Sequence, residues 1–452
     1  MRFPNYLFVL FLVLISCKKE KQPGIVEQAS IEPSITHLDS LLNNMLNCWF
    51  PAVMDTNNGG FYTNFEYNWR LSDNQPKNLL NHARGIWTAS KAAGFYKNNP
   101  MYLEAATHGY NYLVKNFWDN EIGGFHSSSK SKPIGEYKNA YDNSFVIFAL
   151  AEYAKMNDDP AIKEWLNNSF NWFENNVHDS IYGGYNHFVF PENNMNSQNS
   201  IDYKTETGWG ETDWKNQNTS IHIMEAFTNL YQVIPEEKVR KRLEEIFLLI
   251  RDKMVHKNGH LQLYFLPDWT PISHKDSSRN YILENKRYDH ISFGHDIETA
   301  YLLIETAEAL YDKPDSITLQ IAKKLTDHSL QYGMDNNNYG MFYEGYRFNG
   351  SNEVEIINEQ KSWWVQAEAW HAFAVMQHYF PEEEKYKIAH KNMWKYIDEQ
   401  MIDKSYGGWF NFGLDNNPEN EKSKKGHSWK TAYHNGRALM QVIQYRRENL
   451  IK

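Results

Sequence analysis

Apolar residues recur at spacings of three and four positions along most of the chain, which is the pattern of helices that bury one face. Twelve segments carry this pattern, and they fall into six consecutive pairs. They are 35–50, 79–96, 102–118, 143–153, 162–177, 220–233, 237–254, 291–311, 317–332, 363–379, 384–401 and 431–445. No internal stretch has the composition of a linker, so we expect one domain over 34–452.

A short turn motif recurs between these pairs. It consists of an aspartate, a few polar residues, two glycines and an aromatic residue, as in the stretch from Asp55 to Phe61. Glycine pairs accept positive φ and suit tight turns, and the aromatic residue suits a short strand. The second position of the pair falls at residues 60, 124, 184, 260, 340 and 408, with a degenerate copy at Asn258 to Leu261. The repeating unit therefore spans 60 to 80 residues.

Six helical hairpins of one repeat cannot each bury their own apolar face, so they must stack on their neighbours. Closing the stack gives an all-α (α/α)6 barrel, with short strands and the glycine turns at one end. An open solenoid is the alternative. Closure is favoured because the last helix carries polar residues typical of a site, whereas a solenoid would end in a polar cap.

The N-terminus resembles a bacterial lipoprotein signal. Arg2 precedes an apolar run at 7–15 that is too short to span a bilayer, and a small residue then precedes Cys17. We expect 1–16 to be a signal peptide and 17–33 to be a flexible tether that follows a lipidated Cys17. This predicts a membrane-anchored, periplasmic protein whose contact with the membrane is the lipid alone. An ordinary secretory signal or a membrane anchor is the alternative.

Composition narrows the classes of partner. The net charge of −10 argues against nucleic-acid binding, which needs a basic surface. Aromatic residues make up 15% of the chain, which suits a cavity that stacks flat ligands. Cys48 is the one other cysteine, so no internal disulfide is expected and the fold must rest on its core.

The helix that follows each turn carries polar and aromatic residues unusual for a core. Every second helix of a closed ring lines the inside, so these residues are expected to converge on one cavity. They are Arg84, His222 with Glu225, His295 with Glu298, Trp363 and Trp364 with Glu368, and Trp429 with His434.

Two of these sets share a spacing. His222 and Glu225, like His295 and Glu298, are three residues apart and so lie on one helix face. A carboxylate in that place can orient the imidazole and raise its basicity. Either pair alone is more typical of a structural polar couple, but their matching places in the repeat favour a site.

Tryptophan rings stack on sugars, and histidine is the natural general base near neutral pH. Two histidines and a cation suffice to move a proton next to a carbonyl and to stabilise the resulting oxyanion. A glycosidase would instead need two carboxylates in the cavity. Asp142, Asp296, Glu298 and Glu368 keep that alternative open.

A metal site is another possible use of these residues. Two His-x-x-Glu pairs could bind a divalent ion. The pairs lie in separate repeats, and the chain has neither a His-Glu-x-x-His motif nor a cysteine cluster. We therefore expect neither a metal nor another cofactor.

These motifs together resemble the N-acylglucosamine 2-epimerase superfamily, and most closely its cellobiose 2-epimerases, over roughly 34–447. The segments that carry the resemblance are the Arg84 helix, Asn-x-x-x-His222-x-x-Glu-Ala, Gly294-His295-Asp-Ile-Glu298, Trp363-Trp364-x-x-x-Glu368 and Trp429-x4-His434-Asn-Gly-Arg. The resemblance implies an (α/α)6 barrel that needs no metal.

It also implies roles. His434 and His295 would be the two acid–base residues at C2, and Glu298 would support His295. Arg84 and His222 would hold the O1/O2 region and stabilise a cis-enediolate. The residues expected to bind the sugar rings are Trp363, Trp364, Glu368, Trp429 and Tyr301, the last standing where similar enzymes tend to have tryptophan.

The expected activity is interconversion of glucose and mannose at the reducing end of a β-1,4-linked disaccharide such as cellobiose or mannobiose. The loops at 191–214 and 268–290 look longer than usual, and they bear on the substrate more than on the reaction. The alternatives are an aldose–ketose isomerase, an (α/α)6 glycoside hydrolase or a sugar-binding lipoprotein. The expected partner is a disaccharide or oligosaccharide, and the chain is expected to be a monomer or weak dimer.

Overall fold

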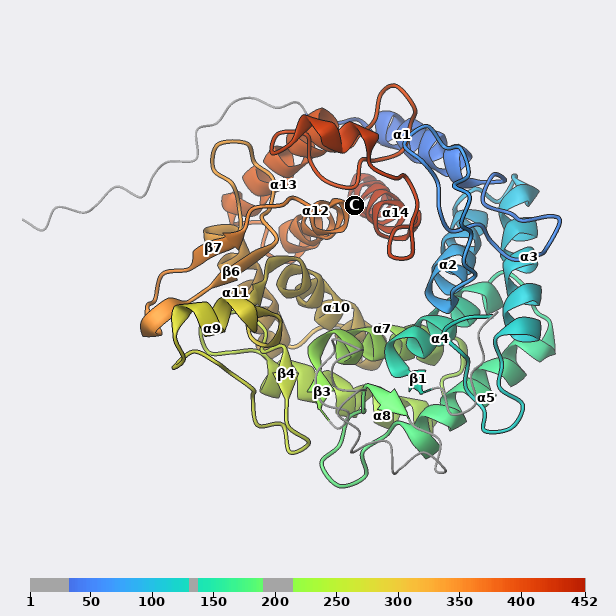
Figure 1. Ribbon diagram of the computed structural model, residues 1–452, viewed down its shortest axis with the longest axis horizontal. Helices are drawn as coiled ribbons and strands as arrows, with labels where there is room; N and C mark the ends of the chain where they lie inside the picture. The colour runs from blue at the N-terminus through green and yellow to red at the C-terminus, as the bar shows by residue number, and fades with distance from the viewer. Residues whose placement is uncertain (1–31, 130–136, 190–213, 452) are drawn as a thin grey trace, which may run out of the picture.

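The computed structural model describes residues 32–129, 137–189 and 214–451, which form a closed ring of two concentric layers of helices (Figure 1). The inner layer consists of α2 (Leu79–Phe95), α4 (Ala140–Ala154), α7 (Gln217–Val233), α10 (Phe293–Tyr311), α12 (Trp363–Tyr379) and α14 (Tyr433–Ile451). The outer layer consists of α1 (Ile35–Trp49), α3 (Pro100–Asn116), α5 (Pro160–Asn176), α8 (Glu237–Leu249), α11 (Ser316–Tyr332) and α13 (Glu384–Tyr396). The ring closes where α14 packs against both α1 and α2. The (α/α)6 barrel is confirmed, and the solenoid alternative is wrong.

Burial explains the two layers. The outer helix α5 buries one stripe that contains Ile162, Leu166, Phe170 and Phe173, as expected of an amphipathic helix at a surface. The inner helix α12 is buried on nearly every side over its first fourteen residues. A helix packed all round can carry polar side chains only where they find partners or line a cavity.

Asparagine and aspartate set where the helices start. The side chains of Asn78, Asn139 and Asn216 accept hydrogen bonds from the first turns of α2, α4 and α7. Asp159 does the same for α5, where Pro160 occupies the first helical position. Asparagine or aspartate just before a helix, and proline at its first position, both favour the start of a helix. α4 and α7 consequently start three residues before the positions predicted from apolar spacing alone.

Short antiparallel strands lie at the end of the ring where the inner helices begin. β1 (Lys138–Asn139) pairs with β2 (Phe188–Val189), and β3 (Lys215–Asn216) pairs with β4 (Tyr264–Phe265). A three-stranded sheet combines β5 (Ile291–Ser292), β6 (Glu344–Tyr346) and β7 (Glu355–Asn358). The structure also has a helix that the sequence did not predict, α9 (Arg279–Glu284), in the loop that precedes β5.

The repeated turns share the same backbone hydrogen bonds. In the first turn, the amide of Asp55 donates to the carbonyl of Gly60, and both glycines have positive φ. A buried lysine neutralises the turn aspartate in five of the six repeats. The pairs are Lys77–Asp55, Lys138–Asp119, Lys215–Asp179, Lys361–Asp335 and Lys425–Asp403. In the degenerate fourth turn, His256 takes the place of the aspartate.

The predicted signal peptide at 1–16 and the lipidated Cys17 lie outside the described residues. Within the described ranges, no helix combines the length and apolar character needed to cross a membrane. The lipoprotein prediction and the predicted periplasmic location stay predictions, as does the oligomeric state.

Substitution of Lys361 tests whether the buried lysines stabilise the turn aspartates. Its Nζ lies 2.6 Å from Asp335 Oδ2 and also contacts Asp415, and its side chain is fully buried. Lys361→Met leaves two carboxylates without their cation, so the free energy of unfolding should fall by about 3–5 kcal/mol in a denaturant titration. Lys387→Met is the control, since Lys387 is an exposed lysine on α13, and it should change stability by less than about 0.5 kcal/mol. Equal effects of the two variants would contradict this role.

A buried histidine predicts how stability depends on pH. His390 stacks on Trp370 with ring centroids 5.4 Å apart, and burial lowers the pKa of His390 to about 3. The unfolded chain, with a histidine pKa of about 6.5, therefore binds more protons between these two values. Stability should therefore decrease as the pH is lowered through that window, and His390→Phe should reduce the slope by about 1.4 kcal/mol per pH unit. An unchanged slope would show that His390 is already charged in the folded protein.

Candidate active site

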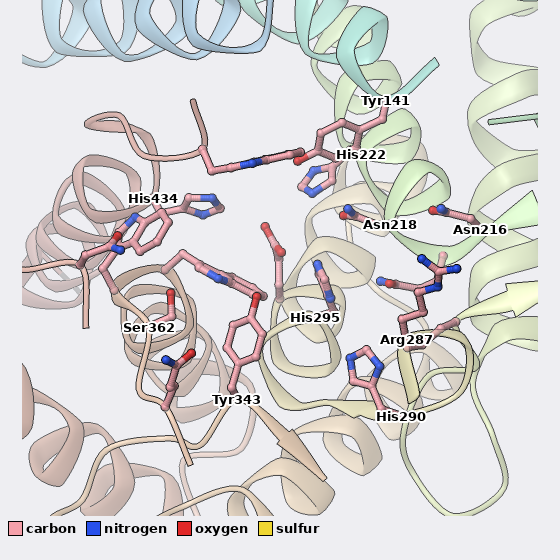
Figure 2. A pocket seen from close by; sticks show the side chains of 18 of the residues that line it. Tyr141, Asn216, Asn218, His222, Arg287, His290, His295, Tyr343, Ser362 and His434 are labelled. Carbon is pink, nitrogen blue, oxygen red and sulfur yellow. The ribbon is translucent and has the colours of Figure 1, made fainter. Parts of the chain in front are cut away.

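A cavity of about 530 Å³ opens at the end of the ring where the inner helices begin (Figure 2). Figure 2 shows His222, His295 and His434 around it, each from a different inner helix. Most of the residues predicted for the site line this cavity. They are Arg84, His222, His295, Glu298, Trp363, Trp364, Trp429 and His434.

His434 is held by a carboxylate beneath the cavity. Its Nδ1 lies 2.6 Å from Glu368 Oε1, and both side chains are buried. Burial opposes ionisation of Glu368, but Arg437 and His434 together hold its pKa below the usual range. An ionised carboxylate can only accept, so Nδ1 carries the hydrogen and Nε2 is left as the basic nitrogen.

The two predicted histidine–glutamate pairs differ in the structure. His222 Nδ1 does lie 2.8 Å from Glu225 Oε2. His295 Nδ1 instead lies 2.8 Å from Ser292 Oγ, and Glu298 accepts a hydrogen bond from Arg437 at 2.8 Å. The expected support of His295 by Glu298 is therefore not observed, because a guanidinium attracts that carboxyl more strongly than a neutral imidazole does.

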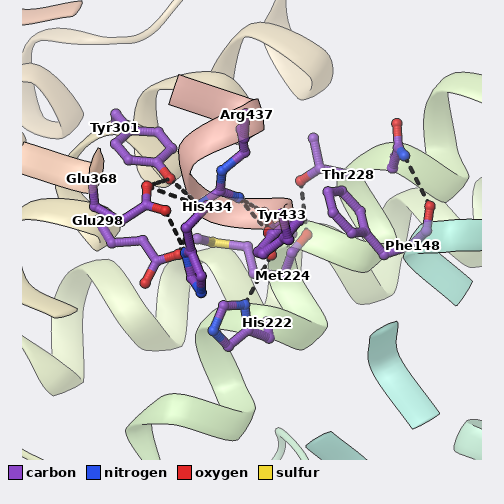
Figure 3. A network of polar contacts seen from close by, with 12 residues as sticks. Phe148, His222, Met224, Thr228, Glu298, Tyr301, Glu368, Tyr433, His434 and Arg437 are labelled. Carbon is purple, nitrogen blue, oxygen red and sulfur yellow. Dashed lines mark hydrogen bonds and ion pairs between the residues drawn. The ribbon is translucent and has the colours of Figure 1, made fainter. Parts of the chain in front are cut away.

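Arg437 is the centre of the polar network beneath the cavity (Figure 3). Its buried guanidinium contacts carboxylates from three other inner helices: Glu225 of α7, Glu298 of α10 at 2.8 Å and Glu368 of α12 at 3.0 Å. It also donates to the hydroxyls of Tyr301 and Tyr433. The three carboxylates surround one cation. Glu225 therefore links His222 to Arg437, and Glu368 links His434 to Arg437.

Glu368 and Tyr301 do not border the cavity, contrary to the expectation that they contact the sugar. Both are buried below it, and the hydroxyl of Tyr301 donates to Glu368 Oε2 at 2.5 Å. Their contacts orient His434 and Arg437. The placement therefore favours a positioning role for both residues.

The tryptophans form the walls beside the histidines. The ring centroid of Trp364 lies 4.9 Å from that of His295 and 5.8 Å from that of His434. Trp364 comes this close because Gly294 has no side chain: a Cβ there would lie 2.5 Å from the indole. Trp363 also lines the cavity, as expected. Trp429 is half exposed at the rim.

Arg84 offers a buried positive charge to the cavity. Its guanidinium donates to the carbonyl of Trp429 at 3.1 Å and to the hydroxyl of Tyr141 at 2.9 Å, and it lies over the ring of Phe145. Among the described residues, no carboxylate lies within ion-pair distance of Arg84. An anionic oxygen in the cavity would supply the missing partner.

Asp296, one of the carboxyls named for the glycosidase alternative, anchors a turn instead. It accepts from the amide of Leu261 at 2.8 Å, and the buried His82 similarly accepts from the amide of Phe61 at 2.9 Å. Neither lines the cavity, and neither does Asp142. Glu298 is thus the one carboxyl among the described residues that lines the cavity, which removes most of the support for the glycosidase alternative.

The sequence did not reveal the roles of Ser292, Tyr141 and Arg437. Ser292 precedes α10, and a serine there is typical of a helix start, which hides its contact with His295. Arg437 lies one helical turn after His434, and this spacing was the one feature of the sequence that could have indicated its place next to the site. Arg287, His290 and Tyr343 also line the cavity from the strand-bearing loops.

Burial keeps the cavity histidines neutral. It lowers the pKa of His434 to about 4, although Glu368 opposes the shift, and it lowers the pKa of His295 to about 3, together with the charges of nearby histidines. The pKa of His222 is lowered for the same reason. At neutral pH each imidazole can therefore accept a proton.

Glu298, Glu368 and His434 also form a group whose ligand atoms lie within 4.8 Å of one another. Atom types alone would suit a cation. The guanidinium of Arg437, however, already donates to both carboxylates.

Arg437 also borders a second cavity, of about 490 Å³, which lies among the last turns of the inner helices.

Comparison with known proteins identifies the family of this chain. The model of the family described as N-acylglucosamine 2-epimerase (GlcNAc 2-epimerase) matches residues 60–438. The chain is 28% identical over 408 residues to the cellobiose 2-epimerase of Bacteroides fragilis, covering 89% of this chain and 96% of that protein. It is 24% identical over 415 residues to the D-mannose isomerase of Marinomonas mediterranea, covering 91% of this chain and 97% of that protein.

The fold is shared as well. The solved structure of cellobiose 2-epimerase from Spirochaeta thermophila has a TM-score of 0.75 at 28% identity, and the match covers 92% of this chain and 97% of that one. Because the family model matches most of the barrel, this chain belongs to the N-acylglucosamine 2-epimerase family.

Proposed function

We propose that this sugar-isomerising enzyme is a 2-epimerase that interconverts glucose and mannose at the reducing end of a β-1,4-linked disaccharide. The observation that carries the proposal is the meeting of His222, His295 and His434 in a cavity with one carboxyl. Acid–base chemistry at carbon needs neutral imidazoles, whereas hydrolysis of a glycosidic bond needs two cavity carboxylates. The likeness to the cellobiose 2-epimerase of Bacteroides fragilis supports this choice of substrate.

His434 and His295 are the acid–base pair of the proposed reaction. In the open-chain aldose, one imidazole removes the C2 proton and the electron pair moves onto O1, which gives a cis-enediolate. The other imidazole, which is neutral in the free site, takes up a proton from solvent beside the negatively charged enediolate and donates it to the opposite face of C2. The first ring then releases the proton that it took from C2 to solvent, so both imidazoles are neutral again.

Arg84 and His222 stabilise the enediolate. The Arg84 guanidinium lacks a carboxylate partner among the described residues, so it can bind the developing charge on O1 without first breaking an ion pair. Both side chains are buried beside the cavity, where such a donor acts more strongly than it would in water. The tryptophan walls hold the sugar ring next to the histidines.

An aldose–ketose isomerase is the second candidate. Protonation of the same enediolate at C1 instead of C2 gives the ketose, and the D-mannose isomerase of Marinomonas mediterranea is a relative of the chain. The products separate the two functions.

Solvent labelling tests the reaction and its two bases. Incubation of cellobiose or mannobiose in deuterated water should put deuterium at C2 with the glycosidic bond intact, as followed by NMR. His434→Asn and His295→Asn should each slow exchange about 100-fold or more, because general acid–base groups contribute that much. His378→Asn, at the other end of the barrel, is the control.

The outcomes distinguish the functions. Free monosaccharide would favour hydrolysis, a ketose would favour the isomerase, and no change would favour a binding protein. Full activity of both histidine variants would overturn the two-base assignment.

Glu368→Gln tests the positioning role. The neutral amide holds the His434 ring less strongly and no longer stabilises its protonated form, so kcat should fall about tenfold or more. KM should stay nearly unchanged, because Glu368 lies outside the cavity lining. Loss of an interaction made only in the transition state has this signature. A raised KM with unchanged kcat would restore the direct sugar contact predicted from the sequence.

A further inference from the structure

One wall of the cavity comes from the loop between β4 and β5, which holds α9 and a short 3-10 turn, Lys286–Tyr288. Arg287 and His290 of this loop line the cavity. In the view of Figure 2 they lie on one side, His434 lies on the other, and His295 lies between them. A substrate with its reducing end at the histidines would extend its second sugar toward this wall.

The wall is held firmly around Arg287. The Tyr288 ring packs edge-on against Trp214 and Tyr264, with centroids 5.5 and 5.4 Å apart. On the other side of Arg287 in sequence, Lys286 Nζ lies 2.5 Å from Glu344 Oε2. These contacts fix the backbone at Arg287 and leave its guanidinium at the cavity surface.

Two other cations of this loop are neutralised, whereas Arg287 has no carboxylate partner among the described residues. Lys286 pairs with Glu344, and Arg279 of α9 pairs with Glu355 at 2.9 Å. The Arg287 guanidinium donates to the hydroxyl of Tyr288 at 2.6 Å and lies over the ring of that tyrosine. Within 32–129, 137–189 and 214–451, no carboxylate lies within ion-pair distance of it.

The cavity as a whole is cationic, although the chain carries a net charge of −10. Its described lining includes two arginines and the single carboxyl of Glu298. Burial and the nearby Glu368 raise the pKa of Glu298 well above its ordinary value, which disfavours its negative charge. The enediolate accounts for Arg84, and a neutral disaccharide would leave Arg287 without an anion.

We propose that Arg287 is a specificity residue that binds the carboxylate of a hexuronic acid linked to the reducing-end sugar. A guanidinium binds a carboxylate through two parallel hydrogen bonds, which fixes both charge and orientation. The other polar groups lining this part of the cavity include the amides of Asn216 and Asn218, which suit hydroxyls. The inference rests on the proposed function and names its substrate class: an aldobiouronic acid is preferred to a neutral disaccharide.

The test compares two substrates that differ in one group: cellobiose, and the disaccharide with the same linkage whose second sugar is glucuronic acid. Deuterium exchange at C2 gives kcat/KM for each. The wild-type enzyme should favour the acidic substrate by about tenfold or more. In Arg287→Gln the ratio should fall to about one, whereas Arg279→Gln should keep the wild-type ratio, because Arg279 belongs to the same loop but does not line the cavity.

A binding measurement separates this inference from the proposed reaction. The two disaccharides reduced to their alditols cannot isomerise, and calorimetry gives their affinities directly. Tighter binding of the acidic alditol that is lost in Arg287→Gln supports the anion site even if no deuterium exchange occurs, and in that case only the proposed reaction fails. Equal affinities of the wild-type protein for both alditols, or a preference that survives in Arg287→Gln, would overturn the inference.

Discussion

Arg437 joins four of the six inner helices beneath the cavity. It lies on α14 and contacts carboxylates of α7, α10 and α12, all of them buried. A guanidinium is stable there only because these acceptors surround it, and the carboxylates are stable only because of the guanidinium. Two of the carboxylates then hold the Nδ1 atoms of His222 and His434. The orientation of two cavity histidines therefore depends on the same cation, and that cation also separates the cavity from the space among the last turns of the inner helices.

Local chemistry made much of the fold predictable. The Asp-Gly-Gly turns are recognisable because positive φ demands glycine, and the apolar spacing of three and four follows from helical geometry. The convergence of Arg84, His222, His295 and His434 on one cavity also followed from the repeat. The lysines that neutralise the turn aspartates were not predicted, because each lies about twenty residues or more from its partner.

The details that sequence reasoning missed are long-range contacts. Spacing on one helix predicted that Glu298 would support His295, but Arg437 lies 139 residues away in sequence and attracts that carboxyl. Glu368 and Tyr301 were assigned to the sugar for the same reason, since nothing local indicates a guanidinium beneath them. The helix α9 has six residues, too few for a periodic signal. The cavity histidines are thus carried by rigid helices, whereas the wall that holds Arg287 comes from a loop.

The common direction of the inner helices has an electrical consequence. All six begin at the end that holds the cavity, and His295 and His434 lie in the first turns of α10 and α14. Each helix start carries a partial charge of about half a proton from its aligned peptide dipoles. The ring therefore gathers six such starts around one opening and six carbonyl ends around the other. Closing the barrel makes its two ends electrically different, and the end with the histidines is the one whose backbone attracts anions.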